Sequence, residues 1–134
     1  AVGIGSLLAD GIGETIRVSL TGDPLKEVSA AKDILKAVGK GSGVELVSCP
    51  TCGRTRIDLV RAASMIEDAV RDIDKNVKVA VMGCVVNGPG EAMEADIGIA
   101  GGDKCAVIFK KGKVLRKISE DEIVPELLKE IEKL

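Results

Sequence analysis

A cluster of glycines at residues 39–43 (GKGSG) is the feature that most limits what this sequence can fold into. Glycine weakens both helices and strands, so three glycines within five residues mark a break between two separately packed parts. The 134 residues are 46% hydrophobic and 30% charged, which suits one modest core with an appendage. We therefore expect a short front segment, residues 1–40, and a main domain, residues 41–134.

The front segment carries patterns for two helices and one strand. Residues 1–11 are apolar and end at Asp10 and Gly11, as the last turns of a helix do. Residues 14–20 (ETIRVSL) alternate between apolar and polar side chains, which predicts a strand, although this segment offers it no neighbour. Asp23 before Pro24 predicts the start of a helix that runs to about Val38.

The main domain alternates between strand and helix patterns. Apolar periodicity predicts strands over 44–47, 77–82 and 96–100, a hairpin of 106–109 with 113–118, and helices over 58–73 and 121–134. The strand over 77–82 is apolar enough to be buried on both faces. This order predicts a small α+β domain with helices on one face of a sheet.

Composition excludes several classes of function. The formal net charge of −2 and a single aromatic residue, Phe109, leave neither a basic surface nor a stacking platform for nucleic acid. No apolar run approaches the roughly 18 residues of a membrane span. There is no histidine, which excludes imidazole-based metal sites and catalytic triads. The core does not need disulfides, so the four cysteines favour a reduced, cytoplasmic setting.

The first cysteine motif, CPTCGR at residues 49–54, follows a predicted strand and lets two thiolates reach one metal ion or one cluster. Zinc, an iron-sulfur cluster and a thioredoxin-like redox pair are all compatible with this motif alone. A zinc ribbon needs a second CxxC, whereas Cys84 and Cys105 each stand alone, which weakens the zinc interpretation. A redox pair would leave the element around Cys84 unexplained.

The second motif, MGCVVNGPGEA at residues 82–92, combines a strand end carrying Cys84, a glycine-rich turn over 87–90 and Glu91. Glycines on both sides of Pro89 allow the backbone to pass close to a bulky inorganic group. The alternative is an ordinary turn with Cys84 as a small buried apolar residue, and composition alone favours that alternative.

Together, SCPTCGR and GCVVNGPGEA closely resemble the two cluster motifs of the 4-hydroxy-3-methylbut-2-enyl diphosphate synthase family. LLADGIGETIRVSLTGDP resembles the end of that family's (β/α)8 barrel, and GGDKCAVIFKKGKVLRKI resembles its closing hairpin, so the likeness covers nearly the whole chain. The resemblance implies a 4Fe-4S cluster bound by Cys49, Cys52, Cys84 and Glu91. It also implies that Asn87 contacts substrate near the cluster.

The resemblance extends to two residues of the front segment. Arg17 and Ser19 share one face of the predicted strand and resemble residues that bind the substrate diphosphate at the end of the last barrel strand. The alternative is a solvated surface charge beside a hydroxyl. Cys105 has no counterpart in the family pattern, so we expect it to have no ligand role.

The implied activity is the two-electron reductive ring opening and dehydration of 2-C-methyl-D-erythritol 2,4-cyclodiphosphate. The resemblance further implies a ferredoxin or flavodoxin electron donor and a homodimer in the full-length protein. Because the earlier barrel units are absent from residues 1–134, we expect this piece alone to be inactive. The alternative function is a non-catalytic module in which the four cysteines bind structural zinc.

Overall fold

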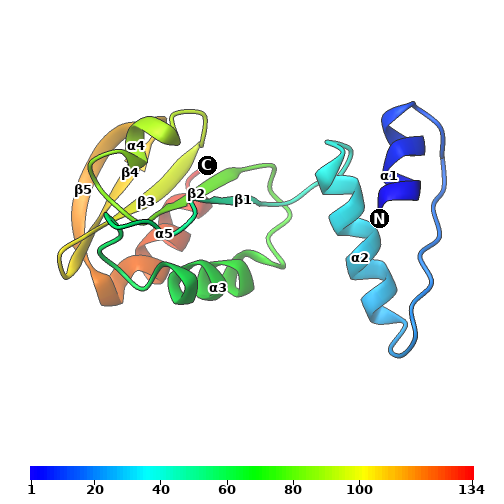
Figure 1. The fold of residues 1–134 in the computed structure, drawn as a ribbon, viewed down its shortest axis with the longest axis horizontal. Helices are drawn as coiled ribbons and strands as arrows, with labels where there is room; N and C mark the ends of the chain where they lie inside the picture. Colours follow the sequence, from blue (N-terminus) through cyan, green and yellow to red (C-terminus); the bar gives the residue numbers. More distant parts are fainter. The chain divides into compact units, whose positions relative to one another are not determined.

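The computed structural model describes all of residues 1–134, which form two compact units, Ala1–Gly43 and Val44–Leu134 (Figure 1). The boundary lies at the end of the glycine cluster, where Gly39 and Gly43 have φ values of 70° and 107°. Side chains other than glycine rarely adopt such values, so glycine is needed at both positions. None of the helices is long and apolar enough to cross a membrane.

The first unit consists of two helices, α1 (Val2–Ala9) and α2 (Leu25–Ala37), which contact each other. The side chain of Asp23 caps α2, because its Oδ1 accepts a hydrogen bond of 3.0 Å from the backbone N–H of Leu25. This confirms the predicted helix start to within two residues. Only Leu8 and Ile34 are buried apolar residues of this unit.

The prediction of a strand over residues 14–20 is wrong, because no strand forms between α1 and α2. A strand needs a neighbour to pair its backbone N–H and C=O groups, and the first unit contains none. The N–H of Leu20 instead donates to Glu27 Oε1, at 3.0 Å. An alternating pattern predicts which side chains share a face, but not whether a partner strand is present.

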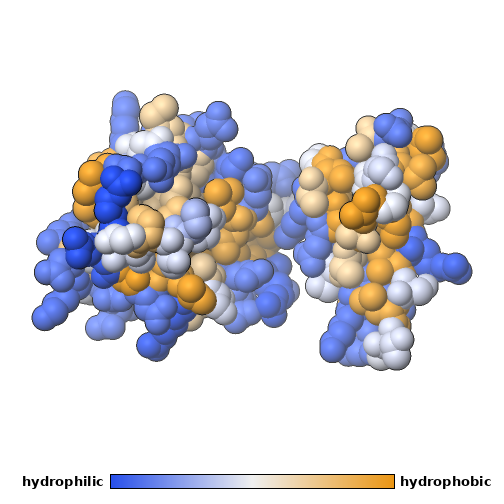
Figure 2. Space-filling model, in the orientation of Figure 1, coloured by the Kyte–Doolittle hydropathy of each residue, from blue (hydrophilic) through white to orange (hydrophobic).

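Apolar side chains remain uncovered on the first unit. Figure 2 shows them gathered on its visible face, and large ones that are exposed include Val2, Leu7, Ile12, Leu20, Leu25 and Val28. Two helices that pack only on each other leave part of their apolar surface in contact with water. The surface is therefore available for packing against further protein.

The second unit is built on one five-stranded sheet in the order β1-β2-β3-β4-β5. The strands are β1 (Glu45–Ser48), β2 (Lys78–Met82), β3 (Ile97–Gly102), β4 (Cys105–Lys110) and β5 (Lys113–Ser119). The first three are parallel, and β4 and β5 continue the sheet antiparallel to their neighbours. The predicted strands of this unit are thus confirmed to within about two residues.

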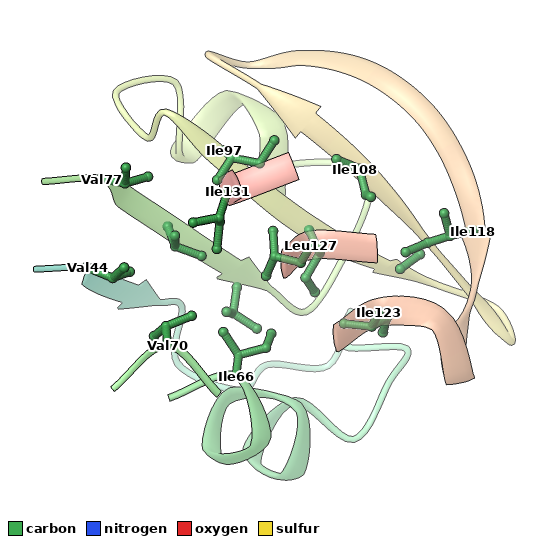
Figure 3. Packing of buried hydrophobic residues seen from close by; sticks show 14 of the residues in the cluster. Val44, Ile66, Val70, Val77, Ile97, Ile108, Ile118, Ile123, Leu127 and Ile131 are labelled. Atoms are coloured by element: carbon green, nitrogen blue, oxygen red, sulfur yellow. The ribbon is translucent and has the colours of Figure 1, made fainter. Parts of the chain in front are cut away.

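Two helices, α3 (Leu59–Val70) and α5 (Ile123–Glu132), cover one face of this sheet (Figure 1). Asp58 caps α3, because its Oδ1 accepts a 3.1 Å hydrogen bond from the N–H of Arg61. Figure 3 shows the core between the sheet and the helices, where the labelled side chains include Ile97, Ile108, Ile118, Ile66, Val70, Ile123, Leu127 and Ile131. The predicted α+β architecture, with these two helices on one face of the sheet, is confirmed.

The opposite face of the sheet is covered by a short helix that the sequence did not predict. Residues 87–90 were expected to form a turn, but α4 (Gly88–Glu91) is helical. A methyl group added to Gly88 would lie 2.7 Å from Met82 Cβ and 3.0 Å from Ala100 Cβ, so only glycine fits there. Strand β2 is consequently buried on both faces, as its apolar sequence indicated.

Folding of the second unit should not require the first. All large buried apolar side chains of the chain except Leu8 and Ile34 lie in residues 44–134. We therefore expect residues 44–134 alone to unfold cooperatively in urea, monitored by circular dichroism. Residues 1–43 alone, with two buried apolar side chains, serve as the contrasting piece and should show no cooperative transition. Loss of cooperativity on deleting residues 1–43 would contradict this division.

A charge network joins β5 to α5. Arg116 donates from Nη2 to Glu126 Oε2 at 2.7 Å and from Nη1 to Glu130 Oε1 at 2.9 Å. Lys129 donates to Glu126 Oε1 at 2.6 Å. The hydrogen bonds from Lys129 and then Arg116 lower the pKa of Glu126 from 4.5 to about 2.

This lowered pKa makes the network sensitive to acid. A carboxylate whose pKa is lower in the folded chain stabilises it above pH 4.5, and that contribution is lost as the pH falls toward 2. We expect Arg116→Met to lower the free energy of unfolding near neutral pH, with the difference from wild type shrinking between pH 4.5 and 2. Urea titrations across this range measure it. Arg71→Met is the matched control, because Arg71 pairs only with an exposed Asp68.

Candidate metal centre

Three of the four cysteines lie at one edge of the sheet. Cys49 directly follows β1, and Cys84 follows β2, whose carboxyl end lies beside that of β1 because the strands are parallel. Cys105 begins β4 and pairs with Gly102 at the carboxyl end of β3. The sheet topology therefore brings residues far apart in the sequence to the same edge.

The sulfur of Cys49 lies against the residue that precedes Cys84. Its Sγ accepts a hydrogen bond of 3.3 Å from the backbone N–H of Gly83. The backbone N–H of Cys49 lies 3.4 Å from the carbonyl oxygen of Val81, which continues the pairing of β1 with β2. This hydrogen bond and the strand pairing place the Cys49 sulfur next to the end of β2.

Cys52 is exposed and is held in a closed turn by Thr55. The N–H of Cys52 donates to Thr55 Oγ1 at 3.1 Å, and the N–H of Thr55 donates back to the Cys52 carbonyl at 3.0 Å. The pKa of the Cys52 thiol is lowered from 9.0, chiefly by a hydrogen bond from the backbone of Arg54 and further by the Thr55 hydroxyl and the Arg54 side chain. The environment of Cys52 thus favours its thiolate, which is the form that binds metal.

The segment from Cys84 to Glu91 is a hydrogen-bonded connection that includes α4. The carbonyl of Cys84 accepts the N–H of Gly88 at 3.1 Å, and the carbonyl of Asn87 accepts the N–H of Glu91 at 2.8 Å. Asn87 is half-buried, whereas Glu91 ends α4 with an exposed side chain. The carboxylate of Glu91 is therefore free of burial and available to a ligand.

The predicted ligands are of types that bind iron, but their side chains do not converge on one point in the structure. Three free thiols and an exposed carboxylate are suitable donors for iron. In the structure, no group of three or more Cys, Asp or Glu side chains lies close enough together to hold a metal ion. The backbone joins the two cysteine motifs directly, because the N–H of Arg56 donates to the Gly83 carbonyl at 3.0 Å.

Arg17 and Ser19 are exposed residues of the first unit, in the connection between α1 and α2. Their role in binding a diphosphate stays a prediction. Cys105 is half-buried, and its Sγ would lie 2.8 Å from a methyl group added to Gly102. The same position lies 3.6 Å from Val85 Cγ1, so Cys105 is near the loop that follows Cys84.

Sequence reasoning missed two residues of this site, Thr55 and Gly83. A glycine between an apolar strand and a cysteine was the available signal for Gly83, since such a position often allows a close backbone approach. The hydroxyl of Thr55, three residues after Cys52, is typical of a side chain that closes a turn. Neither signal shows that the two residues contact each other.

Two family models match the chain. The GcpE protein C-terminal domain matches residues 45–133, and the GcpE TIM-barrel domain matches residues 1–32. The first match covers almost the whole of the second structural unit.

Curated relatives carry one name, 4-hydroxy-3-methylbut-2-en-1-yl diphosphate synthase (flavodoxin). That of Caldanaerobacter subterraneus is 62% identical over 135 aligned positions, covering 100% of this chain and 38% of the relative. Those of Clostridium perfringens and Geobacillus kaustophilus are 59% and 56% identical, covering 98% and 100% of this chain. The chain spans 36 to 38% of the length of these three relatives.

Proposed function

The chain belongs to the GcpE family, and we propose that it forms the iron-sulfur part of a 4-hydroxy-3-methylbut-2-enyl diphosphate synthase. The observation that carries the proposal is the joining of the two cysteine motifs at one edge of the sheet, where the Cys49 sulfur accepts the N–H of Gly83. Residues 41–134 are the cluster domain, and residues 1–40 are the last part of the barrel.

The reaction converts 2-C-methyl-D-erythritol 2,4-cyclodiphosphate to 4-hydroxy-3-methylbut-2-enyl diphosphate. A ring carbon–oxygen bond breaks, two electrons and two protons enter, and one water leaves. When bound, a 4Fe-4S cluster supplies the electrons singly and offers a Lewis-acidic iron. A flavodoxin or ferredoxin is the proposed electron donor, and relatives carry flavodoxin in their names.

The chain's own residues divide the work of binding. Cys49, Cys52 and Cys84 provide three thiolates, and the lowered pKa of Cys52 favours its deprotonated form. Glu91 would provide a carboxylate, which is a harder and more labile ligand for iron than a thiolate. Asn87, four residues earlier on the same turn, orients the substrate through its amide.

The front segment provides the diphosphate site. Arg17 can donate several hydrogen bonds to phosphate oxygens, and the Ser19 hydroxyl can add one. The exposed apolar side chains of this unit suit packing within a complete barrel. We further propose that the full-length protein is a cytoplasmic homodimer.

Replacing Arg17 tests the diphosphate site separately from the cluster. In the full-length protein, Arg17→Met should raise the KM for the cyclic diphosphate by about tenfold, because a charge-assisted contact to phosphate is lost. Iron content should stay at the wild-type value. Arg61→Met, a change at an exposed arginine on α3, is the control. An unchanged KM for Arg17→Met would remove Arg17 from the proposed site.

Turnover tests the function as a whole. Full-length protein, purified without oxygen and supplied with reduced flavodoxin, should convert the cyclic diphosphate to the linear allylic diphosphate, followed by chromatography. Omission of the flavodoxin is the control. A protein that contains the cluster and a functional electron supply but gives no product would contradict the proposed reaction.

A further inference from the structure

The two cysteine motifs contact each other through Thr55 and Gly83. Gly83 is buried, and a methyl group added to it would lie 2.9 Å from Thr55 Oγ1 and 3.0 Å from Thr55 Cγ2. Such distances are shorter than ordinary van der Waals contact, so the threonine side chain occupies the space that any other residue at position 83 would need. Gly83 has no positive φ, so the requirement is for space and not for backbone conformation.

Each member of this pair is bonded to a different cysteine. Thr55 makes reciprocal hydrogen bonds with Cys52, through its Oγ1 at 3.1 Å and its N–H at 3.0 Å. Gly83 donates its N–H to Cys49 Sγ at 3.3 Å and is covalently joined to Cys84. Displacing either Thr55 or Gly83 therefore changes the positions of the three thiols relative to one another.

A second connection holds the pair together. The N–H of Arg56, next to Thr55, donates to the Gly83 carbonyl at 3.0 Å. The turn that carries Cys52 is thus attached to the end of β2 by a backbone hydrogen bond and by the side chain of Thr55. The carboxyl end of β2 is buried, so it provides a rigid support for the exposed turn.

We propose that Thr55 and Gly83 act as a positioning pair that sets the arrangement of Cys49, Cys52 and Cys84 for binding the cluster. This inference rests on the proposed function, because it concerns the same cluster. Neither residue supplies a ligand or contacts substrate. Thr55 acts through its hydroxyl on Cys52 and through its bulk on Gly83.

Two changes at position 55 separate the hydroxyl from the shape of the side chain. Thr55→Val keeps the branched shape and removes the hydroxyl, whereas Thr55→Ser keeps the hydroxyl. Thr51→Val makes the same chemical change at an exposed threonine between Cys49 and Cys52 and is the matched control. All variants are made in the full-length protein, and the cluster is assembled without oxygen.

The measurements are iron and sulfide per chain and the rate at which a chelator removes iron. Residues that support metal ligands typically change metal affinity by about 10- to 100-fold, so we expect Thr55→Val to lose iron at least about tenfold faster than wild type. Thr51→Val should stay within about twofold of wild type. Thr55→Ser keeps the hydroxyl but loses the methyl group next to Gly83, so its rate of iron loss should lie between those of wild type and Thr55→Val. Thermal unfolding of the iron-free variants should be unchanged, which separates positioning from general stability. Equal rates of iron loss for Thr55→Val and Thr51→Val would overturn the inference.

Gly83→Ala tests the contact between Thr55 and Gly83 independently. The added methyl group must push Thr55 away, so this variant should bind less iron than wild type while its iron-free form still unfolds cooperatively. Full iron content in Gly83→Ala would contradict the proposed close contact. A wild-type protein that binds no iron or sulfide would instead overturn the proposed function, so the two failures are distinguishable.

Discussion

Replacing Cys84 by serine in the full-length protein is expected to remove most of its iron, while Cys105→Ser leaves the iron content nearly unchanged. Serine replaces a soft thiolate with a hydroxyl that binds iron poorly. Cys84 is joined to Gly83, whose N–H donates to the Cys49 sulfur, so the chain holds Cys84 close to the first cysteine motif. Iron and sulfide analysis after anaerobic assembly gives the result.

Cys105 is a demanding control for Cys84. Both are half-buried free thiols, and both lie at the same edge of the sheet. If the loss of any thiol at this edge reduced iron binding, the two variants would lose iron equally. A specific ligand role for Cys84 predicts iron loss in Cys84→Ser alone. Iron loss in Cys105→Ser comparable to that in Cys84→Ser would show that Cys105 belongs to the ligand set.

Replacing Glu91 by alanine is expected to keep the three cysteine bonds to iron but to change the environment of one iron. The Mössbauer spectrum of the full-length protein should show this change at a single iron, with turnover reduced by about a hundredfold or more. The reason is that the exposed carboxylate of Glu91, at the end of α4, is the proposed fourth ligand, and alanine offers no donor atom in its place.

Glu94→Ala is the matched control for Glu91→Ala. Glu94 is also exposed and lies in the same connection between β2 and β3. Its replacement should leave both the Mössbauer spectrum and turnover near the wild-type values. A spectrum of Glu91→Ala that is identical to wild type would show that another group completes the iron coordination.

Elements with strong periodicity were predictable from the sequence. The strand β2 is apolar on both sides, and the structure buries both of its faces. Helix α3 begins after Asp58, whose carboxylate caps it, although the helix ends at Val70 and not at residue 73 as expected. Such local signals are sufficient because capping and side-chain periodicity act within a few residues.

Elements that depend on distant contacts were not predictable. The alternating residues 14–20 form no strand because no partner strand is present in their unit. The sequence GPGE forms the helical turn α4 because Gly88 packs directly on Met82 and Ala100. A sequence pattern contains no information about either contact, since both depend on the folded sheet.

The candidate site shows the same division. The cysteines at the ends of β1 and β2 could be expected to lie close together, because parallel strands end at the same edge. The contact of Thr55 with Gly83 and the pairing of Cys105 with Gly102 depend on tertiary packing and strand register. Resemblance to the family implied the ligand set, and the structure shows the contacts that Cys49 and Cys52 make with Gly83 and Thr55.

Elemental analysis of the full-length protein, purified without oxygen, tests the central claim most directly. A bound 4Fe-4S cluster predicts a brown protein with broad visible absorption and about four iron and four sulfide ions per chain. Zinc is colourless because its d shell is filled. A colourless protein that contains one zinc ion per chain and no sulfide would contradict the account and would support a structural metal site built from the four cysteines.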